Sequence, residues 1–339
     1  MKPARKKTFM QWFHSIAGQQ SLVTVVFMIA PVFLLILFTY LPFAEMIKFS
    51  FFKMTYLTRR PKWIGWQNYQ SVFSDPTIFG ALKLSFYYMG GALIQTALAL
   101  LLAAILTSGL KHTNFFKGCI FFPYLVCGIS LGFIFKFFFT HGYVLDTILS
   151  WCGFNISNLP YWLNDTSVNN AMLVGTSIWK YTGQNMVLFI GAMMSVDSDL
   201  YEAASIDGAN AWQRFRYITM PGIKTMIVLN LILSISGSLS AFEPPYVITG
   251  GTFGTATYFV VMDRIAHTNN LVGLASAMAI VLMGLIAVVT VIQKLVSYYL
   301  LDEDESGCTR RERRIAAKRR AVSLRRSSVH AGPSANAEP

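Results

Sequence analysis

The sequence predicts an all-α membrane protein with six transmembrane helices. Hydrophobic residues make up 54% of the 339 residues and charged residues only 13%, whereas a soluble domain carries about a quarter charged residues. The apolar residues are concentrated in runs, and a run of about 20 residues is long enough to cross a bilayer as a helix. Six runs approach or exceed this length, at residues 21–44, 81–108, 115–139, 170–195, 225–247 and 271–299.

Basic residues near the ends of these runs predict the orientation of the chain. Four of them precede the first run, at Lys2, Arg5, Lys6 and Lys7, and an arginine-rich segment follows the last run. Cytoplasmic segments carry an excess of lysine and arginine, so both termini are expected in the cytoplasm, with the basic first outer loop as an exception. The net charge of +12 therefore reflects membrane orientation and does not indicate nucleic-acid binding.

Three parts of the chain are expected. Residues 1–20 form a basic cytoplasmic N-terminus, and residues 21–299 form the six-helix transmembrane domain. Residues 300–339 combine an acidic cluster with an arginine-rich block that also contains serine, alanine and proline. Segments of this composition cannot bury enough apolar surface to fold, so a disordered cytoplasmic tail is expected.

Residues 197–221 lack a membrane-like apolar run and fall on the cytoplasmic side, between the fourth and fifth predicted spans. Two pairs of residues match helix start signals: Asp199 with Glu202, and Asn210 with Gln213. Gly208 fits the end of the first helix because glycine adopts the left-handed C′ conformation without penalty. Pro221 is expected to end the second helix.

Each of the two predicted helices carries a packing stripe. The first stripe comprises Leu200, Ala203, Ala204 and Asp207, and the second comprises Trp212, Phe215 and Ile218 or Thr219. Helices this short are marginal alone in water, so the stripes need a surface in this chain or in a partner. Spacing alone leaves two interpretations open, a docking element or an ordinary amphipathic loop.

The same stretch resembles the EAA loop of ATP-binding cassette (ABC) importers, which belongs to their binding-protein-dependent inner-membrane permease subunits. The residues that carry the resemblance are Glu202, Ala203, Ala204, Asp207, Gly208, Ala209, Phe215, Ile218 and Pro221. The usual Leu-Pro ending is Met220-Pro221 here, a volume-conserving replacement. The resemblance implies the type I ABC importer permease fold and an ATPase that docks on this loop, with Glu202 and Gly208 expected to carry the coupling.

Catalytic motifs are weak or missing in the sequence. No G-x-x-x-x-G-K-[ST] motif occurs, so ATP and Mg²⁺ are expected on a separate ATPase subunit, with no cofactor on this chain. No metal-binding spacing of cysteine and histidine is present either. Residues 128–132 match the G-x-S-x-G nucleophile elbow around Ser130. They lie inside an apolar run, where the glycines favour helix packing over a hydrolase site.

Polar residues inside the predicted spans are candidates for a transport path. Lys180 lies near the middle of the fourth run, and ionisable groups at this depth usually face a cavity or a partner. In the fifth run, Ser234, Ser238 and Phe242 are expected to share one helical face, and Glu243 follows. The serines are equally able to bond helix carbonyls or to pack against neighbouring helices.

Most of residues 21–299 resemble the core of carbohydrate-uptake permeases of the maltose and oligosaccharide type. Residues 249–251 are similar to the TGG segment of that group, and residues 65–76 are similar to its "GLxNY…DP" lead-in. The resemblance implies sugar contacts at Trp179, Lys180, Ser234, Ser238 and Ser130. Maltose-type members have asparagines in the fifth span where this chain has serines, alanine and Glu243, so the identity of the sugar is not specified.

The resulting expectation is the permease subunit of an ABC importer of a sugar, an oligosaccharide, in the bacterial cytoplasmic membrane. Its expected partners are a second homologous permease, a dimer of ATPase subunits, an extracellular sugar-binding protein and membrane lipid. One alternative is a permease for a phosphorylated polyol such as glycerol phosphate, with Lys180 as the anion partner. A different class, a proton-coupled secondary transporter, would use Lys180 and Glu243 as titrating groups, and a membrane hydrolase would use Ser130.

Overall fold

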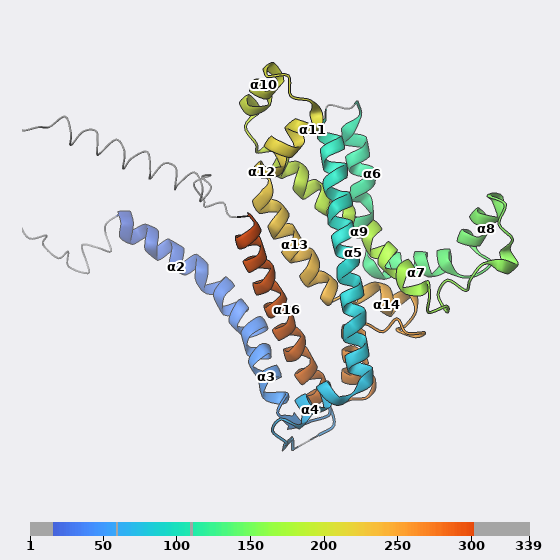
Figure 1. Cartoon of the computed structure of the whole chain (residues 1–339). Helices are drawn as coiled ribbons and strands as arrows, with labels where there is room; N and C mark the ends of the chain where they lie inside the picture. Colours follow the sequence, from blue (N-terminus) through green and yellow to red (C-terminus); the bar gives the residue numbers. More distant parts are fainter. Residues whose placement is uncertain (1–15, 59, 109–110, 302–339) are drawn as a thin grey trace, which may run out of the picture. The chain divides into compact units, whose positions relative to one another are not determined.

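A computed structural model of the chain describes residues 16–58, 60–108 and 111–301 (Figure 1). The chain forms two compact units. Unit 1 comprises Met1–Phe86, Lys136–Asn170 and Ala241–Gly284, and unit 2 comprises Tyr87–Phe135, Ala171–Ser240 and Leu285–Pro339. Most of the expected N-terminal segment, up to residue 15, and the expected tail from residue 302 onward lie outside the described residues.

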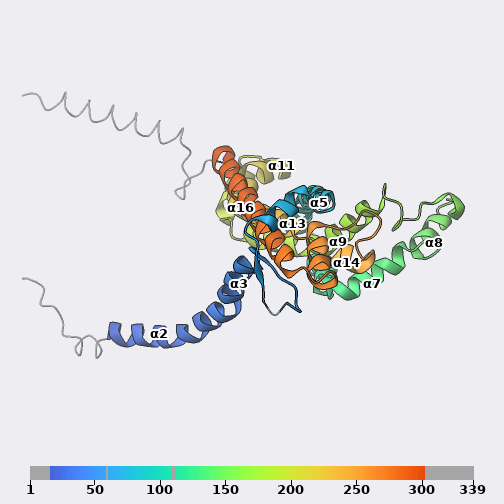
Figure 2. The same ribbon diagram turned by 90° about the horizontal axis from the view of Figure 1, so that it is seen from below.

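The first apolar run is helical throughout, from α2 (Ile16–Leu35) through the π-helical turn η1 (Ile36–Tyr40) to α3 (Leu41–Phe49). Figures 1 and 2 show these elements as one gently bent rod. The π turn directly precedes Pro42, which lacks an N–H and therefore interrupts the regular hydrogen-bond ladder of the helix at this point. All side chains from residue 23 to residue 42 are exposed, so this helix presents a continuous apolar surface.

A short hairpin follows, which the sequence did not indicate. Strands β1 (Phe52–Lys53) and β2 (Lys62–Trp63) pair antiparallel, with Phe52 opposite Trp63. The buried side chain of Asn68, on α4 (Gln67–Ser74), donates to the carbonyl oxygens of Ser50 and Phe52. These bonds fix the hairpin to the helix that follows it.

The third predicted span is broken. Helices α6 (Thr113–Leu125) and α7 (Gly128–Phe139) meet at an angle of 97°. Pro123 lies in the last turn of α6, and Val126 adopts an extended conformation that ends the helix. The apolar run therefore forms two helices and not the continuous helix that its length predicted. The segment that follows α7 contains α8 (Val144–Trp151) and the 3₁₀ turn η2 (Ile156–Asn158).

The remaining apolar runs are also helical. They correspond to α5 (Pro76–Thr107), α9 (Asn169–Met194), α13 (Lys224–Leu239) with α14 (Glu243–Ile248), and α16 (Val272–Leu301). Between α14 and α16 lie α15 (Tyr258–Asp263) and the π-helical turn η4 (Arg264–Thr268). By length and apolarity, four described segments qualify as membrane spans, or five if the bent pair counts as one. Helix α9 is not among them, and it carries Lys180 and several amides.

Close helix packing forms the core of unit 2. Ala99 and Ala103 of α5 form one buried cluster with Met186, Phe189 and other large side chains of α9. Ile223 belongs to the same cluster. Gly183 on α9 lies so close to α6 that an added Cβ would collide with the carbonyl oxygen of Ile120. Small residues at such positions allow helix backbones to approach one another.

We therefore expect Gly183→Ala to destabilise the protein by about 1–3 kcal/mol, the usual cost of overpacking a core. The obstructing atoms belong to the backbone and have little freedom to move. Thermal unfolding of the solubilised full chain measures the effect. Gly175→Ala is the matched control on the same helix, because nothing lies within 4 Å of a Cβ at that position. Equal midpoints for the two variants would contradict the packing argument.

Candidate functional site

The stretch predicted to couple the chain to a partner begins with α10 (Ser198–Ile206). The side chain of Asp197 caps this helix by accepting a hydrogen bond from the N–H of Asp199, at 3.0 Å. The predicted start at Asp199 was therefore two residues late. Asp197 has an extended backbone with ψ of 127°, so its carboxylate turns back onto the first turn, as an N-cap residue requires.

Gly208 ends α10, as predicted. Its φ is +76°, a conformation that residues with a side chain rarely adopt. The N–H of Gly208 donates to Ser205 O, and the N–H of Ala209 donates to Ala204 O. This pair of bonds is the Schellman arrangement that satisfies the last carbonyls of a helix. No atom lies within 4 Å of a Cβ built at Gly208, so the need for glycine comes from backbone conformation and not from crowding.

The second helix of the stretch starts as predicted but continues further. Asn210 and Gln213 form a reciprocal capping box at α11 (Ala211–Arg214), with both bonds at 2.8 Å. Pro221 was expected to stop the helix, and this was wrong. The π-helical turn η3 (Phe215–Thr219) leads directly into α12 (Met220–Gly222), so the helical segment continues past Pro221 and ends at Gly222.

One contact holds the stretch together, and another attaches it to the core of unit 2. The hydroxyl groups of Tyr201 and Thr219 lie 2.9 Å apart and join α10 to η3. Phe215 packs against the core cluster that contains Ile223. Both helices are therefore held in place while much of their surface stays free.

Four large apolar side chains of the stretch remain exposed, and together they form what we call the coupling surface. They are Leu200, Ile206, Trp212 and Tyr217, with exposed fractions between 53% and 88%. Glu202, Ala203 and Asp207 are also exposed, whereas Ala204 and Ala209 are half-buried. Exposed apolar groups gathered on two short helices are typical of an interaction site.

A buried polar cluster joins α9 and α13 within unit 2. Asn185 Nδ2 donates to Ser234 Oγ at 3.2 Å, and Ser234 Oγ donates to Asn230 Oδ1 at 3.3 Å. Both asparagines are buried. Neither asparagine was predicted as a path residue, although Asn230 lies one helical turn before Ser234, a spacing that places both on the same face. We call these three residues the polar cluster.

Other predicted path residues of unit 2 have different surroundings. Lys180 is 7% exposed, and its Nζ lies 5.2 Å from the centre of the Tyr181 ring. Half-exposed Trp179 packs edge-on against Phe135, with ring centres 5.3 Å apart. Ser238 Oγ donates to the carbonyl oxygen of Ile235 in its own helix. The serine at this position thus bonds a helix carbonyl, the simpler of its two expected roles.

Three more residues that the sequence pointed to are Phe242, Glu243 and Ser130. The prediction for Phe242 is wrong. Phe242 does not share a helical face with Ser234 and Ser238, because α13 ends at Leu239 and Phe242 is the N-cap residue of α14. Glu243, in the first turn of α14, belongs to unit 1. Ser130 is exposed on α7, and none of its hydrogen bonds within the described part of the chain goes to a histidine or a carboxylate.

Comparison with known proteins identifies the chain. Residues 95–298, more than half of the sequence, match the family described as the inner membrane component of binding-protein-dependent transport systems. The chain belongs to this family. It is thus a membrane transport component and not an enzyme, and its described helices include four or five that are long and apolar enough to span the inner membrane.

Individual relatives of this inner-membrane component cover most of its length. It is 29% identical to a probable ABC transporter permease protein, YurN of Bacillus subtilis, over 78% of the chain and 92% of that protein. It is 31% identical to AraP, the arabinooligosaccharides transport system permease protein of the same organism, over 85% of the chain and 91% of AraP.

The fold also matches a solved structure. A bacterial alginate ABC transporter, in complex with an alginate pentasaccharide-bound periplasmic protein, contains a chain that aligns with a TM-score of 0.74. The two chains are 19% identical, and the match covers 83% of this chain and 96% of the other. At this identity the likeness establishes the fold alone.

The polar cluster makes a specific prediction about stability. Ser234→Ala should destabilise the protein by about 1–3 kcal/mol, because it leaves the buried amides of Asn185 and Asn230 without their shared partner. Ser238→Ala is the matched control, since that hydroxyl bonds only the carbonyl of its own helix. Thermal unfolding of the purified chain should show a clearly larger drop for Ser234→Ala, and a smaller or equal drop would argue against the cluster.

Proposed function

We propose that this chain is the permease subunit of an ABC importer that carries an oligosaccharide across the bacterial cytoplasmic membrane. The observation that carries the proposal is its 31% identity to the arabinooligosaccharide permease over 85% of the chain. The aromatic and hydroxyl side chains on α9 and α13 fit this substrate class, because sugars combine apolar ring faces with many hydrogen-bonding groups.

The proposed topology has six spans. Helix α9 is 26 residues long, or about 39 Å at 1.5 Å per residue, which is enough to cross the hydrocarbon core. Its polar side chains are compatible with a membrane when they are buried against α13, as Asn185 is. With the bent pair α6 and α7 counted as one span, both termini and the coupling surface face the cytoplasm.

The proposed partners follow from this topology. The coupling surface docks on an ABC ATPase dimer, which binds the ATP and Mg²⁺ and hydrolyses the nucleotide. The exposed apolar side chains of α2 face membrane lipid and a second homologous permease. A binding protein delivers the sugar to the outer loops, an arrangement that fits the periplasmic partner of the alginate transporter.

In the proposed mechanism, movement is transmitted through rigid attachments. Closure of the ATPases draws the coupling stretches together, and Tyr201, Thr219 and Phe215 transmit that displacement to the core of unit 2. The spans then open the path outward, and ATP hydrolysis returns it inward. The proposed path residues in unit 2 are Trp179, Lys180, Ser234, Ser238 and Ser130. Glu243, the remaining residue proposed from the sequence, belongs to unit 1.

A second candidate substrate is a phosphorylated polyol, because a buried ammonium group at Lys180 favours an anionic ligand. Uptake assays in cells with and without the chain separate the candidates. We expect loss of the chain to abolish uptake of labelled oligosaccharide, and excess glycerol phosphate not to compete. Competition by glycerol phosphate instead would favour the second candidate. A tagged chain that purifies without an ATPase would favour a proton-coupled transporter.

Substitution of Gly208 tests the coupling role. Gly208→Val should reduce transport by at least about tenfold while the complex still assembles, because a β-branched residue strongly disfavours the positive φ at this position. Gly208→Asn is the matched control, since asparagine tolerates the left-handed region, and most transport should persist. Transport by sugar uptake and assembly by co-purification are measured in parallel. Full transport by Gly208→Val would refute the role.

A further inference from the structure

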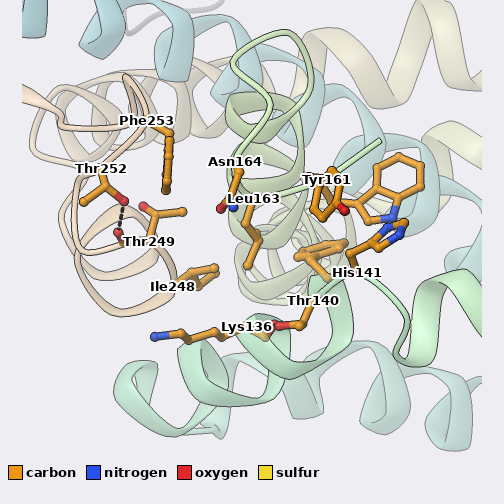
Figure 3. A pocket seen from close by; sticks show the side chains of 12 residues that line it. Lys136, Thr140, His141, Tyr161, Leu163, Asn164, Ile248, Thr249, Thr252 and Phe253 are labelled. Atoms are coloured by element: carbon orange, nitrogen blue, oxygen red, sulfur yellow. Dashed lines mark hydrogen bonds between the residues drawn. The ribbon is translucent and has the colours of Figure 1, made fainter. Parts of the chain in front are cut away.

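Unit 1 contains a cavity of about 440 Å³ that none of the proposed transport residues line. Its walls come from the end of α7, the loop at residues 161–164, and the turn that follows α14 (Figure 3). Small-molecule sites commonly have volumes of about 300–1,000 Å³. The cavity is thus large enough for one or two sugar rings.

One wall is fixed by a buried carboxylate. Asp146 is fully buried and accepts hydrogen bonds from Trp162 Nε1, at 2.6 Å, and from the N–H of Gly142. His141 Nδ1 lies 2.9 Å from the same carboxylate. The rings of His141 and Tyr161 are in contact, with their centres 4.4 Å apart and their planes tilted by 33°, and Tyr161 is 61% exposed. The ring of Tyr161 is therefore held in position without being covered.

The loop that carries this wall is also fixed at its far end. Asp165 accepts hydrogen bonds from the hydroxyl and the N–H of Ser167. These bonds lower the pKa of the Asp165 carboxyl group below its ordinary value. The two bonds thus stabilise the ionised form of the carboxyl group, which is the form that accepts both of them.

The opposite wall contains a strained aromatic residue. Phe253 has a φ of +53° although it is not a glycine, and glycines at positions 250, 251 and 254 share the left-handed sign. Asn169 Nδ2 donates to Phe253 O at 2.8 Å and helps to hold this conformation. Strain of this kind is concentrated at functional sites. The exposed Phe253 ring lines the cavity (Figure 3).

Neutral hydrogen-bonding groups complete the lining. Asn164 supplies an amide. Thr140, Thr249 and Thr252 supply hydroxyl oxygens that can accept hydrogen bonds, because each hydroxyl already donates to a main-chain carbonyl oxygen. Figure 3 shows the amino group of Lys136 extending away from Tyr161 and His141, toward Ile248. Aromatic faces combined with amides and hydroxyls match a ligand that has an apolar ring face and hydroxyl groups around its edge.

We propose that this cavity is a second carbohydrate site, which binds a neutral pyranose ring between Tyr161 and Phe253. This inference rests on the proposed function, since it assigns the same substrate class to a separate unit of the chain. The two aromatic rings contact the ring faces of the sugar, and Asn164 and the threonines bond its hydroxyl groups. The site would hold one pyranose unit of an oligosaccharide.

Direct binding to the purified full-length chain tests the proposal. Maltotriose, cellotriose and xylotriose are titrated separately and followed by saturation-transfer NMR. We expect at least one of them to bind, and Tyr161→Ala and Phe253→Gly each to weaken its binding about tenfold, a typical effect of losing an aromatic contact. Trp151→Ala is the control, because this tryptophan is 81% exposed on α8 and does not line the cavity.

Phe253→Gly separates binding from folding. Glycine adopts the positive φ at position 253 without strain, so the variant should lose the sugar contact but keep its thermal midpoint. The proposal is overturned if none of the three sugars binds, or if both cavity variants bind like the unaltered chain. Failure of the proposed function gives a different result from failure of this proposal. In that case the uptake of oligosaccharides by cells would not depend on the chain.

Discussion

The helices of this protein depend on one constraint, that lipid supplies no hydrogen-bond partners to polar groups. Helix α9 carries Lys180, Gln184 and Asn185 within a stretch of 26 residues, and these groups are costly to expose to hydrocarbon. The bond from Asn185 to Ser234 on α13 meets this requirement inside the protein. A polar helix thus becomes compatible with a membrane through its neighbour, and the same neighbour places hydroxyl and amide groups where a sugar path is proposed.

Close packing makes that arrangement possible. Alanines on α5 leave room for Met186 and Phe189, and Gly183 allows α9 to pass against the backbone of α6. Apolar side chains gain little by leaving lipid for protein, so shape and close approach carry more of the association than burial does. The interior of unit 2 is therefore sensitive to a single added methyl group where two helix backbones approach closely, as at Gly183.

The coupling surface and the cavity of unit 1 have one structural feature in common. In each, buried contacts fix a short segment so that its exposed aromatic or apolar side chains are already in place. Phe215 packs against the core and contacts the ring of the exposed Trp212. Asp146 holds His141, whose ring contacts Tyr161. Holding contact residues before a partner or ligand arrives reduces the conformational entropy lost on binding.

The sequence by itself determined the features that depend on neighbours within about four residues. Apolar runs identified the helices, Asn210 and Gln213 identified a capping box, and Gly208 identified a helix end. Local signals gave wrong helix boundaries at two places. The start of α10 is capped by Asp197 and not by Asp199, and the second helix continues past Pro221. The EAA resemblance pointed to the permease family, which the comparison of residues 95–298 established independently.

Only the tertiary structure decided which distant residues meet. The 97° bend between α6 and α7, the hairpin at Phe52 and Trp63, and the bond from Asn185 to Ser234 each depend on chain geometry beyond a single helix. The cavity between Tyr161 and Phe253 joins segments about ninety residues apart. Hydrophobic periodicity reports which face of a helix is apolar, but it contains no information about which other helix that face will contact.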